Sequence, residues 1–169
     1  MIDRGIDRWP DEVILATKWF KQGHLLATPP FFYAAAVRYG IWILTRAVKE
    51  PAGDVEVIEL DPTGDGPSYG LITTQTCDIN EQRAQPRQPW LQVAPVYRWD
   101  DLDRSKKQQV EKDEVVHLVA LAAPSLPTGF WVADLRIELP VEKSYLVGRE
   151  PVEAFADESG YLRLAERLA

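Results

Sequence analysis

The sequence predicts a mainly β protein with helices, of the α+β class, in which one domain covers residues 1–169. Short runs rich in β-branched and aromatic residues recur along the chain, and clusters of its 10 glycines and 13 prolines separate them. Helical segments do not alternate regularly with these runs. Both observations favour an antiparallel, strongly bent sheet or small barrel over a parallel α/β sheet.

The N-terminal segment begins with a polar tail over residues 1–9, in which Trp9 is the one residue able to dock on the rest of the protein, and continues as a helix. Pro10 and the two acidic residues after it are typical of a helix N-terminus, and Gly23 ends this helix. Residues 24–27 predict a short strand, because a pair of prolines closes the apolar run soon afterwards.

The next part of the chain is expected to supply a strand and a hairpin. Residues 31–48 contain an alanine run that favours helix, but their second part predicts a strand over 41–48. Alternating residues predict strands over 55–60 and 69–76, and the turn cluster at 61–67 between them indicates a hairpin.

A strong strand is expected over 90–97, after an exposed loop at 81–89. Pro95 cannot donate to a ladder, so the strand should end or run along an edge there. Residues 100–114 contain 10 charged residues, six acidic and four basic, which is typical of a solvated helical insert.

The last third of the chain is expected to return to strands before it ends in a helix. We predict strands over 115–122, 130–139 and 141–147, with a turn-rich loop at 123–129. Residues 157–169 predict a helix, because an aspartate at the cap position precedes apolar residues that recur at i, i+3, i+4 and i+7.

The composition excludes several classes of protein. Lys and Arg number 19 and Asp and Glu 26, so the formal net charge is −7. This balance argues against a DNA-coating protein and against a binder of anionic membranes, while it leaves room for a small basic patch. No signal-peptide pattern opens the sequence, and its longest apolar stretch is too short to span a membrane. We expect a cytoplasmic protein without membrane contact.

One cysteine and two histidines exclude a disulfide scaffold and a Cys-rich zinc site, so we predict no metal and no cofactor. Cys77 and Asp78 lie at the predicted end of a strand. A nucleophilic thiolate would need His117 as its base, and Asp78 or Asp134 would orient that histidine. The residue types favour a structural alternative, with a buried cysteine and an aspartate that caps a turn.

Two further groups of residues are candidates for a site. Asp134 and Arg136 have the spacing that places both side chains on one side of a strand. Such a pair is most often structural, but it can also bind a phosphate or the carboxylate of a partner. A binding surface for protein or single-stranded nucleic acid is indicated where aromatic residues flank an arginine, at Tyr97, Arg98 and Trp99.

Four segments, taken in order, resemble the MazF/PemK-like toxin fold, a small SH3-like barrel with a C-terminal helix. The segments are residues 21–26 (KQGHLL), 69–75 (YGLITTQ), 90–96 (WLQVAPV) and 132–146, which contains VADLR and VEKSYL. The last is the most specific, because that family places an Asp-x-Ile/Leu-Arg, a Lys-Ser and a final helix there. The resemblance therefore adds Lys143 to Asp134 and Arg136 as candidate site residues, and it implies a dimer.

The sequence departs from the family at two positions that bear on RNA cleavage. Family members that cleave RNA place an arginine before a proline at the start of the second matching strand, where this chain has Ser68, Tyr69 and Gly70. They also place a threonine or serine where Tyr97 stands. Separately, residues 73–79 resemble a Ser/Thr-Gln-x-Cys-Asp-Ile/Leu segment of uncharacterised bacterial and phage-associated proteins, which implies no activity.

Three functions follow as hypotheses. The altered positions favour an interaction or regulatory module that binds a protein partner in a toxin–antitoxin or phage-defence setting. The alternative is a divergent endoribonuclease, with RNA as its partner, that uses Asp134, Arg136, Lys143 or Arg98. A hydrolase that depends on Cys77 is the third.

Overall fold

The computed structural model describes residues 9–27, 32–36, 55–59, 69–81, 88–122 and 131–169. Its helices are α1 (Asp11–Thr17), α2 (Thr76–Ile79), α3 (Arg104–Glu111) and α4 (Glu158–Leu168), with 3-10 turns η1 (Trp99–Asp101) and η2 (Lys143–Leu146). Its strands are β1 (His24–Ala27), β2 (Phe32–Ala36), β3 (Val55–Glu59), β4 (Tyr69–Ile72), β5 (Trp90–Arg98), β6 (Leu118–Leu121), β7 (Trp131–Asp134), β8 (Leu139–Glu142) and β9 (Val152–Glu153).

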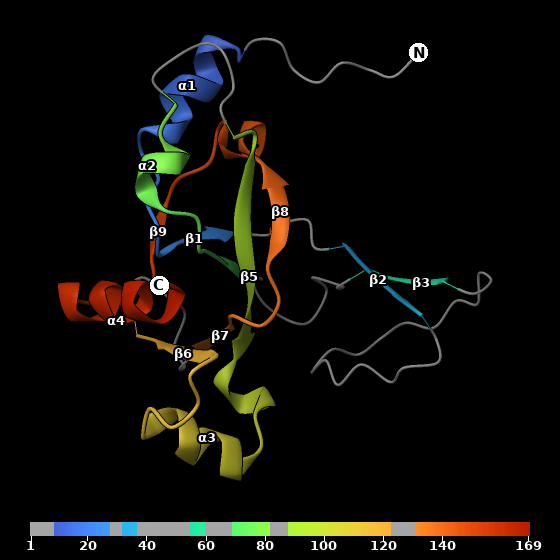
Figure 1. Ribbon diagram of the computed structural model, residues 1–169, viewed down its shortest axis with the longest axis vertical. Helices are drawn as coiled ribbons and strands as arrows, with labels where there is room; N and C mark the ends of the chain where they lie inside the picture. Colours follow the sequence, from blue (N-terminus) through green and yellow to red (C-terminus); the bar gives the residue numbers. More distant parts are fainter. Residues whose placement is uncertain (1–8, 28–31, 37–54, 60–68, 82–87, 123–130) are drawn as a thin grey trace.

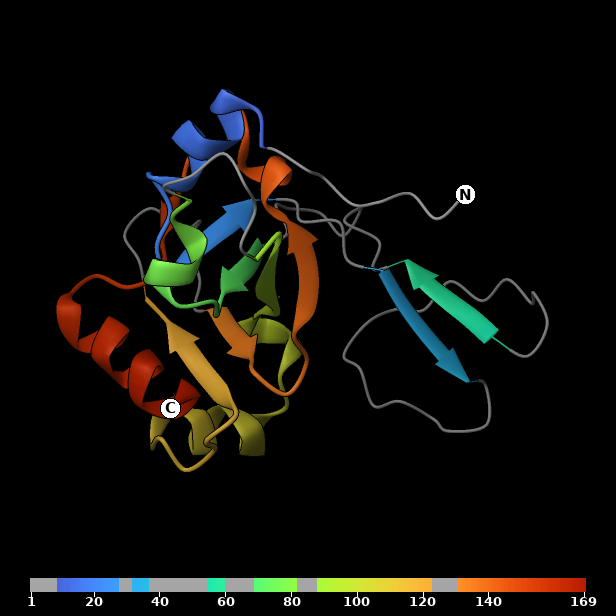
Figure 2. The ribbon, with the colours of Figure 1, turned by 45° about the horizontal axis from the view of Figure 1, so that its top comes forward.

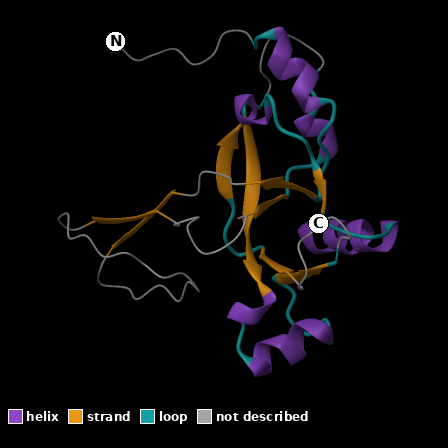
Figure 3. Cartoon of the chain, turned by 180° about the vertical axis from the view of Figure 1, so that it is seen from behind, coloured by secondary structure: helices purple, strands orange, loops and turns teal. Residues whose placement is uncertain are grey.

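Seven of these strands form one antiparallel sheet, which confirms the α+β class. The order across the sheet is β6-β7-β5-β4-β1-β9, and β8 pairs with β5 beside β7. The sheet curls strongly, and an isolated bridge between Ala122 and Phe155 joins its two edges. Helices α1 and α2 lie near one end of β5 and α3 near the other, while α4 lies beside β6 (Figures 1–3).

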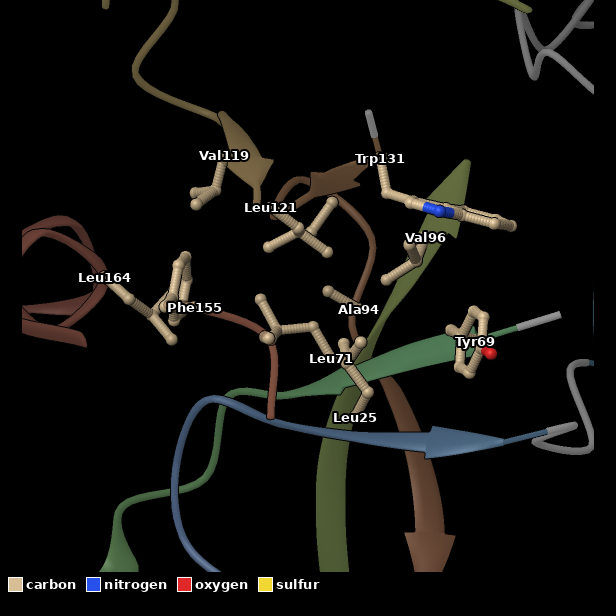
Figure 4. Packing of buried hydrophobic residues seen from close by; sticks show 12 residues of the cluster. Leu25, Tyr69, Leu71, Ala94, Val96, Val119, Leu121, Trp131, Phe155 and Leu164 are labelled. Carbon is tan, nitrogen blue, oxygen red and sulfur yellow. The ribbon is translucent and has the colours of Figure 1, made fainter. Parts of the chain in front are cut away.

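The buried residues follow the two-residue period of the strands, so both faces of the sheet are covered. On β1, β4 and β5, one set of alternate residues points into the curl (Figure 4). It forms a cluster with Phe155 and with Leu164 of α4. The opposite set packs against α1, α2 and η2. A third cluster, which contains Leu118 and Val132, lies under α3.

Pro95 determines how the sheet continues beyond β5. Gln92 faces β4, because its carbonyl accepts a hydrogen bond from the Thr73 amide. Backbone N–H and C=O groups alternate between the two sides of a strand. A backbone N–H at position 95 would therefore point away from β4 and donate toward β7. Proline has no N–H to donate, and the β5–β7 ladder stops at the pair Val96–Ala133. The segment after β7 leaves β5 at this point. It pairs with β5 again as β8, where Leu139 lies opposite Val93.

The predicted strand at 90–97 is confirmed, but it neither ends at Pro95 nor lies at an edge. The helix predicted after Pro10, the strand at 24–27 and the C-terminal helix with its Asp157 cap are also confirmed. Gly23 follows α1 with a φ of +87°, a conformation that favours glycine. Trp9, the residue of the tail that the sequence singles out as able to dock, is fully buried.

Several other predictions are wrong. The strands near 55–60 and 69–76 do not pair with each other, because β3 pairs with β2 in a separate two-stranded sheet and β4 lies between β1 and β5. The alanine run belongs to β2 rather than to a helix.

The expected strands at 69–76 and 141–147 stop at Ile72 and Glu142, and helical turns follow both. In the predicted helix at 100–114, only the segments η1 and α3 are helical, and Val110 is buried. The strand predicted at 41–48 and the loop at 123–129 lie outside the described residues.

Gly160 allows α4 to pack closely against Phe155. A Cβ atom at this position would lie 2.5 Å from the Phe155 ring. Glycine to alanine in a helix usually stabilises by roughly 0.5–1 kcal/mol. We expect Gly160→Ala to lower the free energy of unfolding instead, by about 1–3 kcal/mol, because the ring has to move. Urea unfolding will measure this, with the exposed Leu162→Ala as the control, and an increase in stability would contradict the packing.

Candidate functional site

The turn that follows β7 presents Asp134 and Arg136 together. The Asp134 carboxylate is 7% exposed, and its Oδ1 accepts the backbone N–H of Arg136 at 3.0 Å. It also accepts from the guanidinium, with Nε–Oδ1 at 2.9 Å and Nη2–Oδ2 at 2.5 Å. The turn exists because β7 leaves β5 opposite Pro95. A break in the ladder therefore creates the place for this ion pair.

The two members of the pair face different environments. The Arg136 side chain is 51% exposed, and its Nη1 has no hydrogen-bond partner among the described residues. Burial acts to raise the pKa of Asp134, but the hydrogen bonds from Arg136 outweigh it and hold that pKa below its usual range. The hydrogen bond to Asp134 raises the pKa of Arg136. The result is a permanently charged cation that a buried anion holds in one orientation.

His117 approaches the same turn from the position directly before β6. Leu118 lies opposite Asp134 in the β6–β7 ladder, and the His117 carbonyl accepts the Leu135 N–H at 2.8 Å. Burial lowers the pKa of His117, Arg136 lowers it further, and Asp134 opposes both. The imidazole is therefore neutral at neutral pH, and one of its nitrogens, Nε2, is buried without a hydrogen-bond partner in the described chain.

Tyr97 completes the cluster, which we call the Arg136 cluster and define as Tyr97, His117, Asp134 and Arg136. Burial and the Asp134 charge raise the pKa of Tyr97 to about 12, so the phenol stays protonated at neutral pH. Sequence reasoning paired His117 with Cys77 and named Asp78 or Asp134 as the acid beside it, but it did not place Tyr97 and Arg136 with this histidine. His117 lies inside the strand predicted over 115–122, whereas the observed strand β6 begins one residue later, at Leu118.

The neighbouring binding candidates diverge from this cluster. Trp99 is half-buried and packs with Tyr97 against the apolar cluster under α3. Arg98 is exposed and lies next to Tyr97 in β5, so the two side chains point to opposite faces of the strand. The structure thus brings Tyr97, but not Arg98, toward Asp134 and Arg136.

Lys143 does not join the Arg136 cluster, contrary to the set that the resemblance implies. Its side chain is fully buried at the far end of β8 from the Asp134–Arg136 turn. The ammonium donates to Glu81 Oε1 at 2.7 Å and to the Asp78 carbonyl at 2.5 Å. Asp78 lies in α2 and Glu81 lies just after it. Lys143 therefore links η2 to α2 through these two hydrogen bonds.

Cys77 and Asp78 lie in the short helix α2 rather than at a strand end. Cys77 is exposed, so the expectation of a buried cysteine is wrong, and its Sγ lies 3.7 Å from Gln75 Oε1. Helix α2 lies near the other end of β5 from α3 and β6 (Figure 1), and His117 directly precedes β6 in the chain. The structure does not bring the thiol to the base that the hydrolase hypothesis requires.

In the described part of the chain, no three or more His, Cys, Asp or Glu side chains are grouped as a metal site would need. Within the same residues, no helix combines the length and apolar character that crossing a membrane requires. Comparison with known proteins finds no family model and no curated protein that matches the chain. The function is therefore argued from the site itself.

The Lys143–Glu81 pair provides a test of this assignment. We expect Lys143→Met to lower the free energy of unfolding by about 3–5 kcal/mol, because it leaves the Glu81 charge buried without a partner. The double variant Lys143→Met with Glu81→Leu should lose clearly less, since it removes both charges. Chemical denaturation of the two variants checks this, and equal losses would show that the pair is not coupled.

Proposed function

We propose that the protein is an interaction module that binds a protein partner through the Arg136 cluster. The observation that carries the proposal is the state of Arg136, which Asp134 fixes from the buried side while half of the side chain stays exposed. An arginine that is already oriented loses little freedom when it takes a ligand. Its geometry suits a carboxylate, so an acidic side chain of the partner is the group that it would bind.

The remaining features of the chain are consistent with a protein partner. The net charge of −7 opposes extended contact with a polyanion, whereas one acidic side chain needs only a local cation. The half-buried rings of Tyr97 and Trp99, which pack against the apolar cluster under α3, add apolar surface of the kind enriched at interfaces. On the sequence resemblance described above, we extend the proposal to an SH3-like barrel of the MazF/PemK-like type and to a cytoplasmic toxin–antitoxin or phage-defence setting.

A second candidate, the endoribonuclease, gains support from the position of His117. Cleavage of RNA without a metal needs a base that takes the proton of the 2′-hydroxyl as its oxygen attacks phosphorus. It also needs an acid that protonates the departing 5′-oxygen and a cation for the phosphate charge. Neutral His117, protonated Tyr97 and Arg136 supply these three chemical types in one cluster. Lys143 has no role in this endoribonuclease, because its side chain is fully buried beside Glu81, away from the Arg136 cluster.

Removal of the Arg136 guanidinium should weaken partner binding. We expect Arg136→Ala to raise the Kd for a partner captured from cells that encode the protein by roughly 10–100-fold, the value of a charged hydrogen-bonded contact. Arg136→Lys should recover only part of this loss, because lysine lacks the planar fork. Arg163→Ala, which removes an exposed arginine from α4, is the matched control. Equal binding by all variants would reject the site, provided that circular dichroism shows each of them folded.

Incubation with RNA separates the two candidates. The interaction module should leave an RNA oligonucleotide that carries a fluorophore and a quencher intact at every pH between about 5 and 8, the range in which histidine titrates. Cleavage that disappears in both His117→Ala and Arg136→Ala, but persists in Arg163→Ala, would replace the first proposal by the second. Cleavage that persists in all variants indicates a contaminating nuclease.

A further inference from the structure

The last turn of α4, which lies beside β6 (Figure 2), carries an arginine whose hydrogen bonds leave its own helix. Arg167 is 11% exposed, and its Nη1 atom lies within hydrogen-bond distance of three backbone carbonyls. They belong to Leu118 at 2.6 Å, Val116 at 3.2 Å and Val115 at 3.3 Å. A basic residue in a last turn can bond the free carbonyls of its own helix. Arg167 instead holds the segment that joins α3 to β6.

The segment that Arg167 holds contains His117. The Leu118 N–H donates to the Val115 carbonyl at 3.1 Å, so residues 115–118 form one closed turn around this histidine. Arg167 contacts the carbonyls on both sides of His117, at positions 116 and 118. The planar guanidinium, bound at several points of one turn, restricts that turn more than a single hydrogen bond would. It therefore also fixes the point of the backbone from which the His117 side chain departs.

The start of the same segment places a carboxylate against Arg167. Helix α3 ends in a Schellman motif, in which the Asp113 N–H donates to the Val110 carbonyl and the Glu114 N–H to the Gln109 carbonyl. Asp113 has a φ of +61° and occupies the left-handed position of this motif, where glycine is the usual residue. The aspartate supplies what glycine lacks, because its carboxylate accepts a hydrogen bond from Arg167.

The turn of residues 115–118 connects directly to the Arg136 cluster. The His117 carbonyl accepts the Leu135 N–H at 2.8 Å, and Leu135 lies between Asp134 and Arg136 in the chain. Hydrogen bonds therefore run without a gap from α4, through the His117 turn, to the turn that presents Arg136. A contiguous network of this kind can couple one element of a protein to a site on another.

We propose that Arg167 is a positioning residue of the Arg136 cluster, which anchors the turn of residues 115–118 to α4 and so sets where His117 stands beside Arg136. It acts through the backbone carbonyls of that turn. The docking of the C-terminal helix is thereby a condition for the geometry of the cluster. This inference rests on the proposed function, because it concerns the same cluster.

NMR titration of the imidazole signals tests the proposal in the full chain, since the sequence has two histidines. Burial, Arg136 and Lys106 lower the pKa of His117, and Asp134 opposes them. In Arg167→Met the released turn should take His117 out of this environment. Because burial is the largest cause, the pKa of His117 should then rise toward the ordinary value of a histidine.

His24 serves as the internal reference for the docking of α4. It lies against Glu153, which accepts a hydrogen bond from the Tyr161 hydroxyl of α4. An unchanged pKa of His24 therefore shows that the helix is still in place. Arg163→Met, which removes an exposed arginine from the same helix, should leave both histidines unchanged.

Arg167→Lys should give a His117 pKa between those of the wild type and Arg167→Met, because an ammonium cannot span Asp113 and the three carbonyls together. If circular dichroism shows the methionine variant unfolded, the lysine variant decides. A His117 pKa that stays at the wild-type value in a folded variant would overturn the proposal. A shift of both histidines together would also overturn it, since Arg167 would then be a general anchor of α4.

Partner binding supplies the second readout. Arg167→Met should raise the Kd for the captured partner by about 3–10-fold, less than Arg136→Ala, because it displaces the cluster without removing its cation. A raised His117 pKa with an unchanged Kd would reject the link from Arg167 to binding. The NMR measurement needs no partner, so the positioning role is decided even where the proposed function fails.

Discussion

The missing N–H of Pro95 is the constraint on which the arrangement around β5 depends. A nine-residue strand in the middle of a sheet would normally pair with one neighbour along each side. Here one side pairs with β4 over Val93–Val96 without a break, while the other side is shared between β7 and β8. The residues between those two strands cannot lie flat against β5 and form a turn. The turn carries the only cluster among the described residues in which a buried carboxylate orients an exposed arginine, so the ladder break and the candidate site have one origin.

At the opposite end, hydrogen bonds and one ion pair organise segments that have little regular structure. The Thr17 hydroxyl of α1 donates to the Ile14 carbonyl and accepts the Glu81 N–H. Glu81 in turn accepts from Lys143, which also binds the Asp78 carbonyl. Three short elements distant in sequence are thereby held together without a long helix. The charges at this end serve the packing, whereas those at the Arg136 turn are available to a ligand.

Local pattern predicted those elements whose residues follow a clear period. The strand at 24–27, the strand at 90–97 and the C-terminal helix are of this kind. The predicted strand at 69–76 was too long, because β-branched Thr73 and Thr74 suggest a strand but bond through their side chains to the Gln92 backbone. Asp134 and Arg136 were predicted as a pair. The approach of His117 depends on the β6–β7 register, which local sequence does not encode.

The pairing of β1 with β9 has a consequence for synthesis of the chain on the ribosome. His24 in β1 lies opposite Glu153 in β9, so one edge of the curled sheet joins residues near the two ends of the chain. At translation rates of about 5–20 residues per second, β1 waits on the order of 6–25 seconds for this neighbour. During that interval the edge of β1 can pair with a strand of another nascent chain. The β1–β9 edge therefore forms only after β9 has been synthesised, and chaperones that cover strand edges would act before β9 emerges.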